Sequence, residues 1–522
     1  MSEHQKNDYK TNKLVIWLSI VIFGGLIILG VVSPEKFSSV LTNIVNTLCD
    51  NFGWALNWSI IFCIVVAGYF LISKNGDVIL GGPEAKPEFS TFIWWAISLC
   101  SGMGMGIVFF PPAEVIEYTF RPAVGAGLAS GSTEALSWAF EYTYLHWTIT
   151  LYAVYVAAGL AAAYVIYNLK QPFSVASTLY PLFGNKIYRY RNVIDGLVAF
   201  TIVGGVAGSF GYGILQVADG IRQLTGISTG AMIYIIIGVL ITLVYTISAV
   251  TGLKHGIQWL ADNNAKIFIG MLLFVAVFGP TKFALNIGTE TTGNMLNNIF
   301  KHLTFTEPFM GHDKWSTWWN WLWYLDFFIF APTTGLFLAR LAKGRTMRQF
   351  VCVNLLAPCV FVWAWVTFFG GLAADAQFNG GLDLWKILQE HGIEAIMLSL
   401  FETLPLPMLM KVVMILVIVV SFITLANAVT STVSKMSITP GPNYTAEDPP
   451  GSIQIFWGVL MGAIALLFVL NAGFNGARTV KLLMGFPIVA LQLLVMFGLM
   501  KMFITGKNIE AAPRSDSERE RA

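Results

Sequence analysis

One carboxylate stands inside an apolar stretch that is long enough to cross a membrane. Asp326 lies in Trp315–Arg340, roughly nine residues from the start of its apolar part, and at about 1.5 Å per residue this places it near the middle of a bilayer. A charged side chain at that depth is costly and by default functional. The sequence therefore predicts a functional role for Asp326, with a purely structural ion pair as the alternative.

A second unusual stretch reads SGMGMGIVFFPPAEVIEY, from Ser101 to Tyr118. It places glycines, two prolines and two glutamates where a membrane helix would pass. We predict a backbone break at Gly102, Met103, Gly104 and Gly106, because repeated glycines weaken a helix and transporters bind substrate at such interruptions. Close helix packing is the alternative, since Gly102 and Gly106 also form a GxxxG pattern.

The composition shows what kind of elements must position these residues. Of 522 residues, 56% are hydrophobic and only 11% are charged, too few to cover a water-facing surface. The sequence thus predicts an all-α integral membrane protein. Windows of about 20 apolar residues give twelve candidate spans. These are 14–32, 53–73, 92–112, 142–167, 194–215, 231–253, 267–285, 317–340, 350–374, 408–430, 454–471 and 481–504.

Basic residues orient these spans. Roughly 20 Lys and Arg fall in the loops on the side of the N-terminus against roughly 8 on the other side, as the positive-inside rule expects for a correct count. An even number of spans then places both termini in the cytoplasm of a plasma-membrane protein. Two further stretches, Thr291–Phe300 and Leu384–Leu404, are predicted to be amphipathic helices at the outer interface.

Glycine and proline interrupt two spans that lie five spans apart. Span 92–112 contains the glycine stretch, Pro111 and Pro112 indicate where that helix turns outward, and span 317–340 contains Pro332 and Gly335. Interruptions at matching places suggest two structural repeats. The predicted organisation is a tail (1–13), two extra spans (14–91), a five-helix repeat (92–285), an outer helix and loop (286–316), a second five-helix repeat (317–504) and a tail (505–522).

Several motifs resemble one transporter family. GMGMG is followed by FF and an acid, His146-Trp147 is followed by Tyr155, and the segments GLKHGIQWLADN, FLARLAKGRTMRQF and ITLANAVTSTVSKMS are present in order. Together they resemble the betaine/choline/carnitine transporter family. The resemblance implies inverted five-helix repeats, alternating access, a homotrimer, and a box of aromatic rings that binds trimethylammonium groups through cation–π attraction.

Carried onto this sequence, the resemblance assigns substrate-binding positions. Trp147 and Tyr155 match box positions, and Tyr152 stands where some members have tryptophan. Aligned back from the FLAR motif, the tryptophan-rich positions of the family fall on three further residues, namely Asp326, Phe327 and Phe330.

Two acids replace rings of the family. Asp326 stands at a box tryptophan position, and Glu117 stands at a box tyrosine position of the carnitine exchanger. A carboxylate in a low dielectric favours a compact cation that donates hydrogen bonds. We therefore expect a basic amino acid or a diamine as substrate, with a conventional betaine, carnitine or choline as the alternative. Glu117 facing the outer water is a further possibility.

The resemblance also bears on whether transport is coupled to sodium. The family's sodium site maps to the backbone at Cys100 and Met103 and to the hydroxyl of Thr424, while Leu425 removes a second hydroxyl. Because sodium needs several oxygen ligands, a sodium ion is expected to bind weakly or not at all. Sodium-independent exchange is thus the expectation. Asn264 stands where the exchanger carries a compensating arginine, and Lys266 nearby is more typical of a cytoplasmic edge.

Other classes of protein fit less well. No filter-like loop of a channel is evident, and the histidines are scattered without the spacing of a catalytic or metal site, so neither an enzyme nor a metal centre is expected. A net charge of +2 gives no indication of nucleic acid binding. The expected partners are a small-molecule substrate and the lipid bilayer, and no further cofactor is expected.

Overall fold

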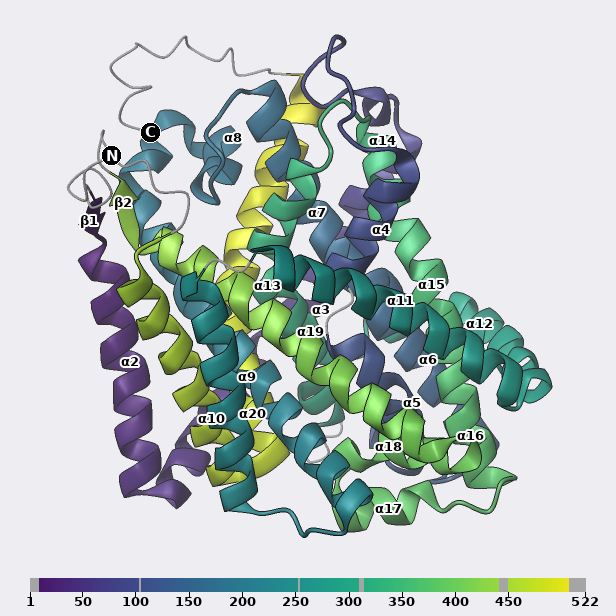
Figure 1. Cartoon of the computed structure of the whole chain (residues 1–522). Helices are drawn as coiled ribbons and strands as arrows, with labels where there is room; N and C mark the ends of the chain where they lie inside the picture. Colours follow the sequence, from purple (N-terminus) through teal and green to yellow (C-terminus); the bar gives the residue numbers. More distant parts are fainter. Residues whose placement is uncertain (1–8, 103–104, 252–253, 309–313, 441–448, 507–522) are drawn as a thin grey trace.

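The computed structural model describes residues 9–102, 105–251, 254–308, 314–440 and 449–506, and these form a bundle of long helices (Figure 1). The short strands β1 and β2 pair antiparallel, with Tyr9 opposite Pro440. They lie toward the upper end of the bundle in Figure 1, as does the C-terminal end of α20, whereas α17 and α18 lie at the lower end.

The elements have the following bounds. They are β1 (Tyr9–Thr11), α2 (Lys13–Val32), α3 (Pro34–Ile72), α4 (Thr91–Gly102), α5 (Met105–Phe120), α6 (Thr133–Leu145), α7 (Leu151–Ala163), α8 (Tyr180–Phe183), α9 (Arg191–Thr225), α10 (Ala231–Thr251), α11 (Lys254–Phe278), α12 (Thr281–Leu303), α13 (Trp321–Arg340), α14 (Met347–Val351), α15 (Ala357–Trp365), α16 (Gly371–Phe378), α17 (Leu384–His391), α18 (Ile396–Ser399), α19 (Pro407–Met436), β2 (Ile438–Pro440) and α20 (Gly451–Thr505). Wider π-helical turns continue α6 into α7 and lead into α13, at His146–Thr150 and Ser316–Asn320.

The helices have the length and composition of a membrane protein. Within the described ranges, nine helical stretches are long and apolar enough to cross a membrane, or ten if one bent pair counts as a span. One of them, α20, contains two predicted spans joined across a kink at Gly473, where φ is 52°. The integral membrane class is thus supported, whereas the count of twelve and the repeats stay predictions.

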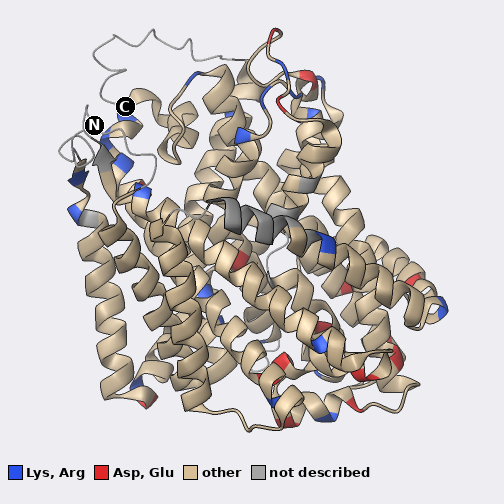
Figure 2. Ribbon diagram, viewed as in Figure 1, with Lys and Arg blue, Asp and Glu red and all other residues tan. Residues whose placement is uncertain are grey.

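Charged residues are sparse along the middle of the bundle, and Asp and Glu gather around α17 and α18 (Figure 2).

The predicted span 267–285 is wrong at its C-terminal end. Helix α11 ends at Phe278, and α12 starts at Thr281 after a bend of 106°. Pro280 lacks the N–H that would continue the helix, and Gly279 lowers the cost of the bend. The expected helix at Thr291–Phe300 is confirmed as part of α12, while the expected helix at Leu384–Leu404 is divided into α17, α18 and short 3₁₀ turns.

The predicted interruption of span 317–340 at Pro332 and Gly335 is also wrong. Helix α13 continues through both residues to Arg340. A Cβ atom on Gly335 would lie 2.7 Å from the Ala158 Cβ, so this glycine permits α13 to approach α7 closely. Likewise α5 continues through Pro111 and Pro112 to Phe120 rather than turning there.

The glycine stretch is described only in part. Helix α4 ends at Gly102 and α5 begins at Met105, while the predicted break positions Met103 and Gly104 lie outside the described residues. Gly106 is the second residue of α5, and a Cβ there would lie 2.5 Å from the Trp147 ring. The absence of a side chain at Gly106 therefore makes room for Trp147.

Helices α7, α9, α13 and α20 form the centre of the bundle. The most extensive contacts join α9 to α20 and α7 to α13. Small residues permit this packing: a Cβ on Gly204 would meet the Met484 side chain at 2.5 Å, and one on Gly208 would meet the Ala477 carbonyl oxygen at 2.9 Å. Close backbone approach through small residues is how membrane helices gain packing energy.

A carboxyl group outside the spans gives a pH-dependent prediction. Glu394 lies between α17 and α18, and burial raises its pKa from 4.5 to about 7. The folded state thus holds this proton more tightly than the unfolded chain, so stability falls as pH rises between about 4.5 and 7. We expect Glu394→Gln to stabilise the protein at pH 8 by about 3 kcal/mol at most, and to have little effect near pH 4.

Thermal unfolding in detergent at the two pH values checks this expectation. Glu390→Gln, which removes an exposed carboxylate on α17, is the matched control. A Glu394→Gln variant whose Tm advantage is the same at both pH values would contradict the assignment.

Candidate functional site

A small cavity lies at the centre of the bundle, where α5, α7, α9, α13, α19 and α20 meet. Its volume is about 110 Å³, small beside the roughly 300–1,000 Å³ of drug-sized sites. We call it the central cavity. Its lining residues are Gly106, Ile107, Phe110, Trp147, Leu151, Tyr155, Ser209, Tyr212, Gln216, Trp323, Asp326, Phe327, Phe330, Thr334, Leu425 and Lys481.

Aromatic rings form much of the wall of the central cavity. The Trp147 and Trp323 rings lie 4.6 Å apart between centroids, and Trp323 lies 4.7 Å from Phe110. Tyr212 contacts Phe110 from α9 at 5.2 Å. Ring faces arranged around a small space attract a diffuse cation such as a methylated ammonium.

Five of the predicted substrate-binding residues line this cavity. They are Trp147, Tyr155, Asp326, Phe327 and Phe330. Tyr152 is buried but is not among the lining residues, so the structure does not bring it together with the other five. The lining positions of this helical run, Trp147, Leu151 and Tyr155, repeat every four residues, and Tyr152 is turned away from that stripe by about 100°.

Three rings of the wall were absent from the predicted site. Phe110, Tyr212 and Trp323 all line the cavity. A signal for Trp323 is present in the sequence, because Trp323, Asp326, Phe327 and Phe330 follow helical spacing on one face of α13. The family positions counted back from FLAR did not include it, so the prediction overstated the loss of tryptophan from the box.

The carboxylate of Asp326 is paired. The Lys481 Nζ atom donates to both carboxylate oxygens at 2.8 Å, and both side chains are buried. Lys481 belongs to α20 and lies 155 positions along the chain from its partner. The sequence gives no signal for this role of Lys481, because a lysine at the edge of span 481–504 is typical of a helix end. The ion pair that was the alternative for Asp326 is therefore present, within the wall of the cavity.

A buried polar cluster supports Trp147 from behind. Its indole Nε1 donates to Glu114 Oε2 at 3.0 Å, and Glu114 is fully buried on α5. His146 lies against the same oxygen at 3.8 Å, and its other ring nitrogen is 3.1 Å from Asn320 Oδ1. This geometry fits a supporting role for His146, which fixes the π-helical turn that carries Trp147.

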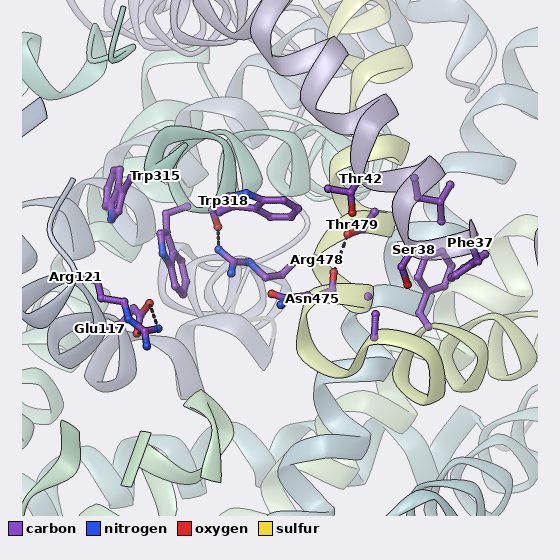
Figure 3. Close-up of a pocket in the computed structure, with 15 residues that line it drawn as sticks. Phe37, Ser38, Thr42, Glu117, Arg121, Trp315, Trp318, Asn475, Arg478 and Thr479 are labelled. Carbon is purple, nitrogen blue, oxygen red and sulfur yellow. Dashed lines mark hydrogen bonds and ion pairs between the residues drawn. The ribbon is translucent and has the colours of Figure 1, made fainter. Parts of the chain in front are cut away.

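A larger cavity of about 670 Å³ lies near the start of α13 and the kink of α20 (Figure 3). We call it the second cavity. Glu117 lines it and pairs with Arg121 at 3.3 Å. Arg478 donates to the Trp318 carbonyl oxygen and lies over the Trp319 ring at 4.2 Å. Glu117 and Asp326 thus line different cavities, and the expected joint grip of both acids on one cation does not occur in this structure.

Phe474 lies between the two cavities. Its ring stacks on Tyr212 of the central cavity at 4.9 Å, and Arg478 of the second cavity lies 5.4 Å from the same ring. Phe474 thus links a wall residue of the central cavity to one of the second cavity.

The proposed ion ligands are described in part. The Thr424 hydroxyl donates to the Val420 carbonyl oxygen of its own helix at 2.8 Å. Cys100 lies in the last turn of α4, and Met103 lies outside the described residues. The Asn264 amide donates to the Ser421 hydroxyl at 2.6 Å, and Lys266 is exposed. A sodium site at Cys100, Met103 and Thr424 stays a prediction.

The helical membrane architecture and the aromatic cavity together define a carrier for small solutes. Residues 14–508 match the profile of the BCCT, betaine/carnitine/choline family transporter. This match covers nearly the whole chain, and the protein belongs to this family.

Named relatives support the same assignment. A probable glycine betaine transporter of Desulfitobacterium hafniense (strain Y51) is 30% identical over 500 residues, which cover 94% of this chain and 97% of the relative. The glycine betaine transporter OpuD of Bacillus subtilis (strain 168) is 29% identical and covers 93% of both chains. The osmo-independent choline transporter BetT1 of Acinetobacter baylyi (strain ATCC 33305 / BD413 / ADP1) is 29% identical over 94% of this chain and 93% of its own.

Proposed function

We propose that this protein carries a small zwitterion or quaternary ammonium compound of the betaine, choline or ectoine type across the plasma membrane by alternating access. The observation that supports this most is the cluster of Phe110, Trp147, Tyr212, Trp323 and Phe327 around the central cavity. Ring faces bind a methylated cation that offers no hydrogen-bond donors. Relatives named as glycine betaine and choline transporters support the same substrate class, as does a relative named as an ectoine/hydroxyectoine transporter, from Virgibacillus pantothenticus, which is 28% identical over 96% of this chain.

The expected basic amino acid or diamine is less well supported. That expectation rested on unpaired carboxylates, yet Lys481 compensates the charge of Asp326. A dication that entered the cavity would find both oxygens of Asp326 already bonded to the Lys481 ammonium. Glu117, the other expected ligand, is paired with Arg121 in the second cavity.

Binding to the purified protein tests the substrate class. We expect glycine betaine, choline or ectoine to raise the Tm of the detergent-solubilised protein, because a ligand that binds only the folded state stabilises it. Lysine and cadaverine are the comparison ligands. Stabilisation by cadaverine, with none by the three proposed substrates, would contradict the proposal.

We propose that transport depends weakly or not at all on sodium, which includes exchange of one substrate for another. Leu425 lines the central cavity and offers no side-chain oxygen, which leaves the Thr424 hydroxyl as the one side-chain oxygen of this pair. We expect uptake into proteoliposomes to change less than twofold when potassium replaces sodium. Preloaded unlabelled substrate should accelerate uptake. A tenfold fall in rate without sodium would contradict this proposal.

A homotrimer with cytoplasmic termini completes the proposal. On α12, Leu285, Leu296 and Phe300 are 43%, 62% and 74% exposed. Exposed large apolar side chains on a helix bent by 106° from its neighbour suit a contact with a second copy as well as with lipid. Cross-linking in native membranes tests the assembly. A labelling reagent that cannot cross the membrane tests the orientation, since it should leave cysteines placed at either terminus unmodified in intact cells.

A further inference from the structure

The Asp326–Lys481 pair forms part of the wall of the central cavity. A purely structural ion pair would have no need to face a cavity. Both residues are among the lining residues, and both are less than a tenth exposed. A lysine ammonium has three donors. Two of them go to the Asp326 oxygens at 2.8 Å, which leaves one donor for another group.

Unsatisfied polar atoms of α9 lie in the same wall. Within the described part of the chain, the Tyr212 hydroxyl and the Gln216 Oε1 atom are buried and have no hydrogen-bond partner. Both residues line the central cavity and are one helical turn apart. The Tyr212 ring centroid lies 5.1 Å from Lys481 Nζ. Buried polar groups without partners are costly, so a bound ligand that satisfied them would gain affinity.

These groups have the donors that a carboxylate accepts. The third Lys481 N–H and the Tyr212 O–H could both donate to one anion, whereas the rings, Asp326 and the acceptor Gln216 Oε1 suit the cationic end of a ligand. Because the pair is neutral overall, a ligand with one positive group and no negative group gains no net ionic partner. A zwitterion places its two charges opposite those of the pair.

We propose that Lys481, together with Tyr212, binds the carboxylate of a zwitterionic substrate, and that the Lys481–Asp326 pair selects carboxylated amines over their carboxylate-free analogues. This inference rests on the proposal that the central cavity holds the transported substrate. It makes Lys481 a specificity-determining residue that the family motifs did not indicate. It also favours a betaine or an ectoine over choline within the proposed substrate class.

The test compares ligands that differ in the carboxylate. Dissociation constants of glycine betaine and choline are measured by titration calorimetry on the wild type and four variants. In the wild type, glycine betaine should bind more tightly than choline. Lys481→Met should reduce this advantage about tenfold to hundredfold, the range of one hydrogen bond to a charged group. Asp326→Asn should increase it, because the ammonium is then left without its carboxylate.

Two further variants control for folding. Asp326→Asn/Lys481→Met removes both charges without leaving an unpaired ion, and it should lose the preference for the carboxylate as Lys481→Met does. Lys411→Met removes a buried lysine that pairs with Glu402 outside the cavity, and the ratio of the two dissociation constants should stay at the wild-type value. A ratio that stays within twofold of the wild type in the double variant would overturn the inference.

A second ligand pair separates this inference from the proposed function. Lysine and cadaverine also differ by a carboxylate. If glycine betaine and choline do not bind but lysine does, and its advantage over cadaverine is lost in Lys481→Met, the proposed substrate fails and the inference stands. If glycine betaine binds with an unchanged ratio in Lys481→Met, the substrate stands and the inference fails. If the protein binds no carboxylated amine of the panel, both are overturned.

Discussion

Trp147→Ala is expected to weaken substrate binding by at least about 30-fold, because a desolvated cation–π contact is worth about 2 kcal/mol or more. Trp147 contacts Trp323 at 4.6 Å and lines the central cavity. Its loss would also leave the buried Glu114 carboxylate without the indole donor at 3.0 Å. Calorimetric titration measures the loss of substrate binding, and initial uptake rates in proteoliposomes measure its effect on transport.

A second substitution separates the two roles of this indole. Trp147→Phe keeps a ring face but removes the N–H that Glu114 accepts, so binding should weaken by less than tenfold. Trp17→Ala removes an exposed tryptophan on α2 and should change neither binding nor uptake. Binding by Trp147→Ala that is indistinguishable from the wild type, in a protein with an unchanged circular dichroism spectrum, would show that the substrate lies elsewhere.

The same tryptophan gives a prediction for its neighbour on α5. A Cβ on Gly106 would lie 2.5 Å from the Trp147 ring, closer than real Cβ contacts allow. Gly106→Ala should therefore displace that ring into the central cavity and weaken substrate binding about tenfold. Gly106→Ala/Trp147→Phe, in which the neighbouring ring is smaller, should recover part of the loss. Equal binding by Gly106→Ala and the wild type would contradict this account of the glycine.

The aromatic part of the candidate site could be predicted from the sequence, because it follows local rules. Trp147 and Tyr155 recur at a helical spacing, and Phe327 and Phe330 lie on the face of α13 that carries Asp326. Side chains on one face of a helix share an environment wherever that helix lies. By the same rule Tyr152, which is one position away from Leu151 in this run, does not line the cavity.

The charge state of the site could not be predicted in this way. Lys481 is 155 positions from Asp326, and no local pattern links a residue of α13 to one of α20. An intramembrane carboxylate predicts that some partner exists, because an unpaired charge there is costly. It does not say whether the partner is a substrate or a side chain. For that reason the expectation of a basic amino acid or a diamine gave too much weight to a substrate cation as the partner of Asp326.

Proline and glycine residues in the sequence do not by themselves show whether a helix is interrupted. At Gly279 and Pro280 they coincide with a bend of 106°, whereas at Pro332 and Gly335 the helix continues. A proline removes one backbone donor, and neighbouring helices in a membrane can satisfy the freed carbonyl. A glycine can serve a bend or close packing, and only the neighbouring backbone decides between them. Gly335 is therefore the position at which the two interpretations can be tested.

Gly335→Val is expected to destabilise the folded protein by about 3 kcal/mol, since inserting carbon atoms into a packed interface typically costs 1–3 kcal/mol and here the obstacle is partly backbone. A Cβ at this position would lie 2.7 Å from the Ala158 Cβ, 2.9 Å from the Ala158 carbonyl carbon and 3.0 Å from the Gly159 nitrogen. Flexible side chains cannot relieve such contacts, so α13 must move away from α7. These two helices carry Asp326 and Tyr155, which both line the central cavity, and uptake should fall together with the Tm.

The matched control is Gly293→Val on α12, where an added Cβ would meet no atom within 4 Å. Both positions are helical, so both variants carry the same change in helix propensity, and the difference between them measures packing between α7 and α13 alone. If Gly335 instead acted as a flexible break, Gly335→Val would stiffen α13, lower the uptake rate and leave the Tm at the level of Gly293→Val. A lowered Tm with weakened substrate binding indicates the packing role, because both follow from separating the two walls of one cavity.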